Sequence, residues 1–95
     1  MDIQRHFEWD ADKAARNLQK HGVALEEAAT VFEDPMFITV VDDEHSTDEE
    51  RYITVGTSSQ SRLLMVAHTD RGGRIRIISA RRATKREAQF YAEAE

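Results

Sequence analysis

A run of arginine and lysine near the C-terminus holds the side chains with the clearest chemical potential. Between residues 71 and 86 the chain has seven cations and no acid. They are Arg71, Arg74, Arg76, Arg81, Arg82, Lys85 and Arg86. Guanidinium groups donate paired hydrogen bonds to phosphate oxygens and stabilise negative charge that develops during phosphoryl transfer. The run therefore indicates an anionic ligand such as a phosphodiester.

The same stretch predicts the two elements that would position these cations. Ile75, Ile77 and Ile78 form the short apolar run of a buried strand. Thr84 followed by Glu87 has the spacing of a capping box, which predicts a helix start. Lys85 and Arg86 then occupy the first helical turn, where the dipole disfavours cations and free N–H groups attract anions.

Strand geometry limits which arginines can act together. On a regular strand, Arg76 and Arg82 point to one face and Arg81 to the other, so all three can share a site only if a bulge intervenes. A structural reading stands beside the functional one. In that reading the arginines pair with acids such as Glu8 and Asp10.

Further candidates come from the histidines and from cations elsewhere. The chain has four histidines, His6, His21, His45 and His68, and histidine is a residue type that can act as acid or base. His21, with Lys20 beside it, and Arg51 are catalytic candidates, whereas His45 is expected to be solvated and His68 packed in a strand. Lys20 and His21 also suit the last turn of a helix, where the dipole favours cations. Arg51 could simply pair with Glu50.

Composition predicts one small domain, residues 1–95, with no redox or membrane features. No cysteine is present, no apolar run approaches a membrane span, and residues 1–5 lack the apolar part of a signal peptide. We therefore expect a cytoplasmic protein.

Residues 42–50 hold six acids, without metal-ligand spacing, and are expected to be a solvated loop. The net charge of −5 divides into −10 for residues 1–50 and +5 for residues 51–95, so either a basic surface forms or the halves neutralise each other.

The predicted fold is α+β, with the element order β-α-α-β-β-β-β-α. A short strand at residues 7–9 precedes a helix at 11–21, capped by Asp10 and Gly22, with an apolar stripe that includes Leu18. A second helix is expected at 25–33. Strands at 36–41, 51–57 and 63–69 and a last strand in the first half of residues 74–87 should form an antiparallel meander with helices packed on one face, before the final helix.

The order and spacing of several short motifs resemble the BrnT family, the toxins of BrnT/BrnA type II toxin–antitoxin modules. The motifs are Phe7-Glu8-Trp9-Asp10, Lys13, Asn17, Lys20-His21-Gly22-Val23, Glu26-Glu27-Ala28, Asp34-Pro35, His45, Glu50-Arg51, Gly56, residues 75–83 and Arg86-Glu87. The resemblance implies a RelE-like ribonuclease fold and RNA as substrate. It also implies a BrnA-like antitoxin partner whose ribbon-helix-helix part binds operator DNA.

Residues and resemblance together predict metal-independent RNA cleavage with the 2′-OH as nucleophile and no cofactor. The expected catalytic residues are Arg76, Arg81, Arg51, His21 and Lys20, and the expected RNA-binding residues are Arg82, Lys85, Arg86 and Trp9. Trp9 has the alternative of a core position. The alternative function is a non-catalytic RNA- or protein-binding module, in which the arginine run docks an acidic partner.

Overall fold

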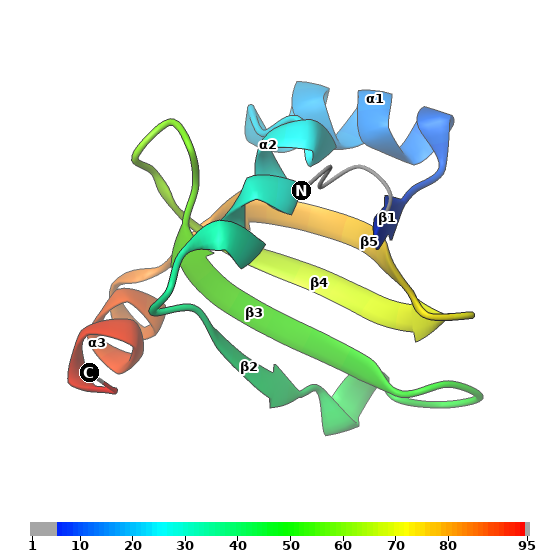
Figure 1. The fold of residues 1–95 in the computed structure, drawn as a ribbon. Helices are drawn as coiled ribbons and strands as arrows, with labels where there is room; N and C mark the ends of the chain where they lie inside the picture. The colour runs from blue at the N-terminus through cyan, green and yellow to red at the C-terminus, as the bar shows by residue number, and fades with distance from the viewer. Residues whose placement is uncertain (1–5, 95) are drawn as a thin grey trace.

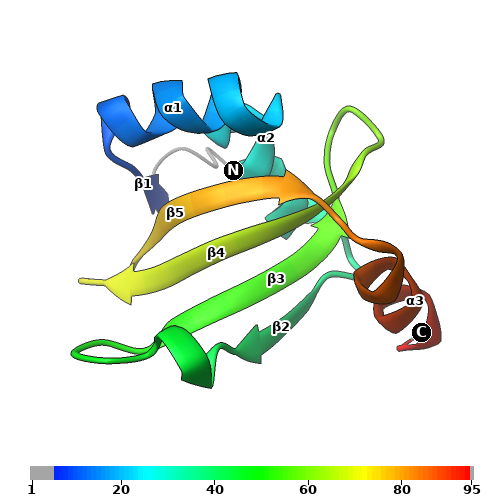
Figure 2. The ribbon, with the colours of Figure 1, turned by 180° about the vertical axis from the view of Figure 1, so that it is seen from behind.

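The computed structural model describes residues 6–94. The prediction that residues 1–5 contain no signal peptide falls outside the described residues. The predicted α+β class is confirmed: helices pack against one five-stranded sheet (Figures 1 and 2). The elements are β1 (Phe7–Glu8), α1 (Ala11–His21), α2 (Leu25–Thr30), the 3-10 turn η2 (Val31–Glu33), β2 (Ile38–Val41), the 3-10 turn η3 (Asp43–His45), β3 (Arg51–Thr57), β4 (Leu63–Arg71), β5 (Arg74–Arg82) and α3 (Lys85–Glu93). Within residues 6–94, no helix is both long and apolar enough to span a membrane.

The sheet has the strand order β1-β5-β4-β3-β2. Strands β2 to β5 form the predicted antiparallel meander. Strand β1 instead pairs in parallel with β5, with Phe7 opposite Ile75 and Glu8 opposite Arg76, which makes the sheet mixed. A two-residue strand carries no periodicity from which its partner or direction could be predicted.

Several element boundaries differ from those expected: β1 ends at Glu8 rather than Trp9, and β4 continues to Arg71 rather than ending at Thr69. The helix predicted at 25–33 is α-helical only to Thr30 and ends in the 3-10 turn η2. Strand β2 begins at Ile38 rather than Met36. The reason is a turn at Asp34, whose carboxylate accepts a hydrogen bond from the Met36 N–H at 2.9 Å and whose carbonyl accepts one from the Phe37 N–H at 3.1 Å.

The main core lies between the sheet and the two N-terminal helices. Its buried members are Phe7, Val23, Leu25, Ala28, Ala29, Val31, Leu64, Val66, Ile77 and Ala80. Gly56 of β3 lets the turn η2 approach the sheet closely, because a Cβ there would lie 2.7 Å from a Val31 methyl. The predicted caps of α1 are confirmed: the Asp10 carboxylate accepts from the Lys13 N–H, and Gly22 has a φ of 70°.

Asn17 attaches α1 to the edge of β5. Its amide nitrogen donates to the carbonyls of Val23 and Ala80, and its amide oxygen accepts from the Ala80 N–H, with distances of 2.9, 2.9 and 3.1 Å. The side chain thus bonds β5 as a neighbouring strand would. Asn17 is the buried residue of α1, while Leu18 is 52% exposed, so the predicted apolar stripe does not describe the buried face of this helix.

Helix α3 lies at the end of the sheet, on the side away from α1 and α2 (Figures 1 and 2), so the helices do not share one face as expected. Its Tyr91 hydroxyl donates to the Asp34 carboxylate at 2.5 Å, and the same oxygen accepts from the Thr57 N–H. Burial alone would raise the pKa of Asp34, but these hydrogen bonds and that from Met36 outweigh it and lower the pKa. Asp34 therefore joins β3, α3 and the turn before β2.

A buried carboxylate connects α2 to the loop between β3 and β4. Glu27, 5% exposed, accepts two hydrogen bonds from the Arg62 guanidinium and one from the Ser58 hydroxyl at 2.7 Å. The hydrogen bonds from Arg62 keep the pKa of Glu27 below its usual value, in spite of burial. Arg62 also donates to the Gly22 carbonyl, so the pair supports the end of α1 as well.

His68 is a packed strand residue, as the sequence predicts. It is 4% exposed, its Nε2 lies 2.7 Å from the Thr54 hydroxyl, and its ring contacts Phe32 and stacks on Tyr52. Within the part of the chain that the structure describes, its Nδ1 has no hydrogen-bond partner. Burial lowers the pKa of His68 to about 4, so the ring is neutral at physiological pH.

We expect Asn17→Ala to lower the free energy of unfolding by about 2–4 kcal/mol, because the buried N–H and C=O of Ala80 lose their partners. Urea unfolding at pH 7.5 measures the change. Leu18→Ala, at the exposed neighbouring position of the same helix, is the matched control and should change stability much less. Equal losses for the two variants would contradict the structural role of the amide.

His68 should make stability fall as the pH is lowered. Its pKa is about 4 in the folded chain and near 6.5 when unfolded, so the unfolded state binds more protons between these values. From pH 7.5 to pH 5, the wild type should lose about 2 kcal/mol more unfolding free energy than His68→Gln. Urea titrations of both proteins at the two pH values test this, and parallel pH profiles would show that His68 does not titrate as inferred.

Candidate functional site

A β-bulge in β5 decides which arginines share a face. Ser79 pairs with Ala67 and Ile77 with His68, which leaves Ile78 as an extra residue without a partner position. The alternation of side chains therefore shifts by one residue at the bulge. Arg76 and Arg81 come to the same face, away from α1 and α2, while Arg82 points to the opposite face. This is the arrangement that a regular strand would have excluded.

The face of the sheet away from α1 and α2 carries a hollow of about 270 Å³, which we call the open-face hollow. Its lining residues are Asp42, His45, Arg51, Ile53, Met65, Ala67, Ile78, Ser79 and Arg81. Two predicted catalytic residues, Arg51 of β3 and Arg81 of β5, are thus brought together by strand pairing through β4. The apolar floor and paired cations suit a ligand that has both an anionic group and a flat base.

Arg81 is held in position by the first turn of α3. Its guanidinium donates two parallel hydrogen bonds to the Glu87 carboxylate at 2.8 and 2.9 Å. The hydrogen bond from Arg81 keeps the pKa of Glu87 below its usual value, and Glu87 also completes the predicted capping box with Thr84. Arg51 makes no ion pair with Glu50 among residues 6–94, so its charge is not neutralised by the acid beside it.

His45 is a functional candidate that the sequence interpretation named among the possible acid–base histidines but left out of the expected catalytic residues. The acidic loop predicts a solvated histidine, yet His45 lines the open-face hollow at the end of η3, with a side chain 62% exposed. Its Nδ1 lies 2.8 Å from the Asp42 carboxylate. An imidazole oriented by a carboxylate is a common acid–base arrangement. The available signal was the spacing of Asp42 and His45 within one predicted loop.

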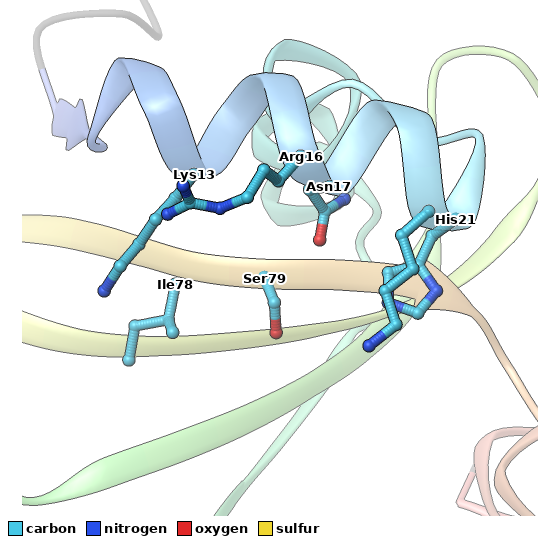
Figure 3. Close-up of a pocket in the computed structure, with 7 residues that line it drawn as sticks. Lys13, Arg16, Asn17, His21, Ile78 and Ser79 are labelled. Carbon is cyan, nitrogen blue, oxygen red and sulfur yellow. The ribbon is translucent and has the colours of Figure 1, made fainter.

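A second hollow of about 280 Å³ lies between α1 and β5, and we call it the α1–β5 groove (Figure 3). It is lined by Lys13, Arg16, Asn17, Lys20, His21, Ile78 and Ser79. The predicted catalytic residues Lys20 and His21 lie here, together with Lys13 and Arg16, which the sequence interpretation missed. Their helical spacing was an available signal, since residues three, four and seven apart share a helix face.

The two hollows adjoin, because Ile78 and Ser79 line both. Figure 3 shows Lys13 and His21 reaching from α1 toward the side of β5 from which Ile78 and Ser79 project. The predicted catalytic residues therefore divide between two neighbouring hollows. Arg51 and Arg81 belong to the open-face hollow, and Lys20 and His21 to the α1–β5 groove.

Five predicted site residues lie outside the linings of both hollows: Arg76, Arg82, Lys85, Arg86 and Trp9. Arg76 donates to Glu8 of β1 at 3.1 Å, which is the pairing that the structural reading expects. Trp9 is half-buried and packs against the core. Arg82, Lys85 and Arg86 are exposed, and their contact with RNA stays a prediction.

The acidic residues do not form a metal centre within the described part of the chain. Among residues 6–94, no group of three or more histidine and carboxylate side chains could hold a metal ion. The carboxylates of the acidic loop have contacts within the protein. Asp42 contacts His45, and Glu49 pairs with Arg71 at 3.0 Å.

Comparisons with known proteins identify the family. Residues 9–87 match the family model described as the ribonuclease toxin BrnT of type II toxin–antitoxin systems. No curated protein matches significantly. The crystal structure of the Brucella abortus ribonuclease toxin BrnT superposes with a TM-score of 0.60 at 20% identity, covering 83% of this chain and 96% of that one. The structural likeness supports the fold, and the family match, which extends over most of the sequence, shows that this chain belongs to the BrnT family of ribonuclease toxins.

Proposed function

We propose that the open-face hollow is the site of RNA cleavage and that the reaction uses the 2′-OH of RNA as nucleophile without a metal ion. The observation that supports this most directly is the convergence of Arg51, Arg81 and the Asp42–His45 pair on one hollow. The arrangement supplies two cations for a phosphate and a titratable group for proton transfer.

In the proposed reaction, Arg51 and Arg81 hold the non-bridging oxygens of the scissile phosphate. His45 accepts the 2′-OH proton through Nε2 while Asp42 orients the ring through Nδ1. The 2′-oxygen attacks phosphorus, and the bond to the 5′-oxygen breaks as that oxygen takes a proton from water. The products are a 2′,3′-cyclic phosphate and a 5′-OH, and the two guanidinium groups stabilise the added charge of the phosphorane.

Lys20 and His21 take a different part in this proposal. They line the adjoining α1–β5 groove rather than the hollow that contains Arg51 and Arg81. We therefore assign proton transfer to His45 and assign Lys20 and His21 to contacts with the rest of the RNA. Arg76, whose guanidinium pairs with Glu8, is assigned a supporting role at the β1 edge.

A type II toxin has a protein antitoxin, and we propose a BrnA-like partner with a ribbon-helix-helix part that binds operator DNA. The exposed apolar residues Val40 and Val41 of the edge strand β2 could contribute to its interface. RNA as substrate also favours the cytoplasm as the location. Growth arrest on expression, relieved by co-expressing the adjoining reading frame, would support the pairing, whereas arrest that persists would count against it.

One observation favours a structural role for Arg81 instead. Its two-point pairing with Glu87 connects β5 to α3, so its loss could unfold the helix rather than remove a catalytic charge. In that case the hollow would serve a non-catalytic binding module. Substitutions in the hollow and at Glu87 distinguish the two roles.

We expect Arg81→Ala, Arg51→Ala and His45→Ala each to lower kcat for RNA cleavage by about 10²-fold or more, on the scale of losing one oxyanion donor or an acid–base group. Glu87→Gln is the matched control for Arg81. It removes the ion pair but keeps the arginine charge, and glutamine can still complete the capping box. Single-turnover kinetics and thermal melting of all four variants provide the measurements.

The catalytic role requires that Arg81→Ala loses activity at a nearly unchanged melting temperature while Glu87→Gln retains most activity. The structural role gives the opposite pattern. Both variants would then melt earlier, and their activity would follow the folded fraction.

Cleavage should persist in excess EDTA, because the proposed charge stabilisation comes from Arg51 and Arg81 rather than from an ion. The measurement is the cleavage rate of one RNA before and after dialysis against EDTA. A rate that falls to background and returns with Mg²⁺ or Mn²⁺ would refute the metal-free reaction.

A further inference from the structure

The α1–β5 groove has a chemistry of its own that the cleavage step does not use. Four cationic or titratable side chains, Lys13, Arg16, Lys20 and His21, line it together with the Ser79 hydroxyl. Among residues 6–94, no carboxylate lines the groove. Because like charges repel, this concentration of cations on one helix face is unfavourable for the isolated helix. The groove therefore suits an anionic ligand.

The groove is also held open by a rigid connection. Asn17 fixes α1 against β5 through three hydrogen bonds, one turn from Lys13 and Lys20 in either direction along the helix. Ion pairs for Lys13, Arg16 and Lys20 are absent among the described residues, in contrast to Arg76 and Arg81. Their charges can therefore bind a ligand without breaking an ion pair within the protein.

The position of the groove relates it to the proposed cleavage site. Ile78 and Ser79 line both hollows, so a chain that crosses β5 at the bulge passes from one to the other. Lys13 and His21 reach toward that same side of β5 (Figure 3). A polynucleotide with its scissile phosphate near Arg81 would place a neighbouring part of its backbone in the α1–β5 groove.

We propose that the α1–β5 groove is a second phosphate-binding subsite that holds the backbone of single-stranded RNA beside the scissile phosphate. The groove binds phosphodiester oxygens through Lys13, Arg16 and Lys20, and it has no part in proton transfer. It selects polynucleotides over dinucleotides, because only a longer chain occupies both hollows. The inference rests on the proposed function for its ligand, but its test does not require cleavage.

The test measures binding of a fluorescent 2′-O-methyl RNA octamer, which lacks the nucleophile, by anisotropy over a range of salt concentrations. Removing one cation that binds a phosphate should reduce the slope of log Kd against log salt by about 0.7 for a single strand. Lys13→Ala/Lys20→Ala should weaken octamer binding about tenfold or more at low salt and reduce the slope by about 1.4. Both lysines are exposed, so the melting temperature should not change.

Arg74→Ala is the matched control, since it removes one exposed cation from the β4–β5 hairpin outside both hollows. It should leave the slope nearly unchanged. Cleavage of a long RNA provides the second measurement: the double variant should have a higher KM than the wild type, whereas Arg74→Ala should keep the wild-type KM.

The outcomes separate the two proposals. An unchanged slope in the double variant overturns the subsite, whether or not the protein cleaves RNA. A reduced slope in a protein that never cleaves RNA supports the subsite and refutes the proposed cleavage. Tight binding of polyglutamate to the wild type, with no effect of the lysine variants on the octamer, would assign the groove to an acidic polypeptide instead. No octamer binding at low salt would overturn both proposals.

Discussion

The hydrogen bonds between Asn17 and β5 are the constraint on which the rest of the arrangement depends. Among residues 6–94, β1 pairs with β5 at Phe7 and Glu8, and the edge of β5 beyond these two positions has no further strand beside it. The Asn17 amide supplies both a donor and an acceptor to Ala80 and so satisfies the backbone groups of that residue without a strand. Because the amide is buried, breaking these bonds is costly, and α1 keeps one fixed position. Asn17 therefore helps to place the cations of the α1–β5 groove, together with the Arg62 contact at the end of α1.

The two faces of the sheet separate the main core from the proposed cleavage site. The core lies on the face with α1 and α2, where Leu64, Val66 and Ile77 are buried. The other face carries the open-face hollow, and the bulge at Ile78 is the reason that Arg81 points there rather than into the core. Polar contacts outside the core then fix the surrounding elements: Asp34 holds α3 and the start of β2, and Glu27 with Arg62 holds the end of α1.

The uneven charge distribution has two consequences in the fold. Part of it is neutralised between the halves of the chain, through pairs of Glu8 with Arg76, Glu27 with Arg62 and Glu49 with Arg71. The other part of the charge is not neutralised in this way. Among the described residues, Arg51 and the cations of α1 line hollows without forming ion pairs. The basic surface is therefore smaller than the arginine run suggests. It also includes the cations of α1, which belong to the acidic half of the sequence. A protein of net charge −5 can in this way present a local positive surface to a nucleic acid.

Local patterns in the sequence determined the elements. The caps at Asp10, Gly22 and Thr84 act within one turn of a helix, so residue types a few positions apart were enough to predict them. The motif pattern likewise identified the family. Only the tertiary structure decided which side chains meet. The bulge depends on the register between β4 and β5, and the pairing of Arg81 with Glu87 depends on where α3 packs. His45 and Lys13 line hollows because strands and helices that are distant in the sequence pack beside them. Such contacts follow from long-range packing, which a single sequence does not encode in any local spacing.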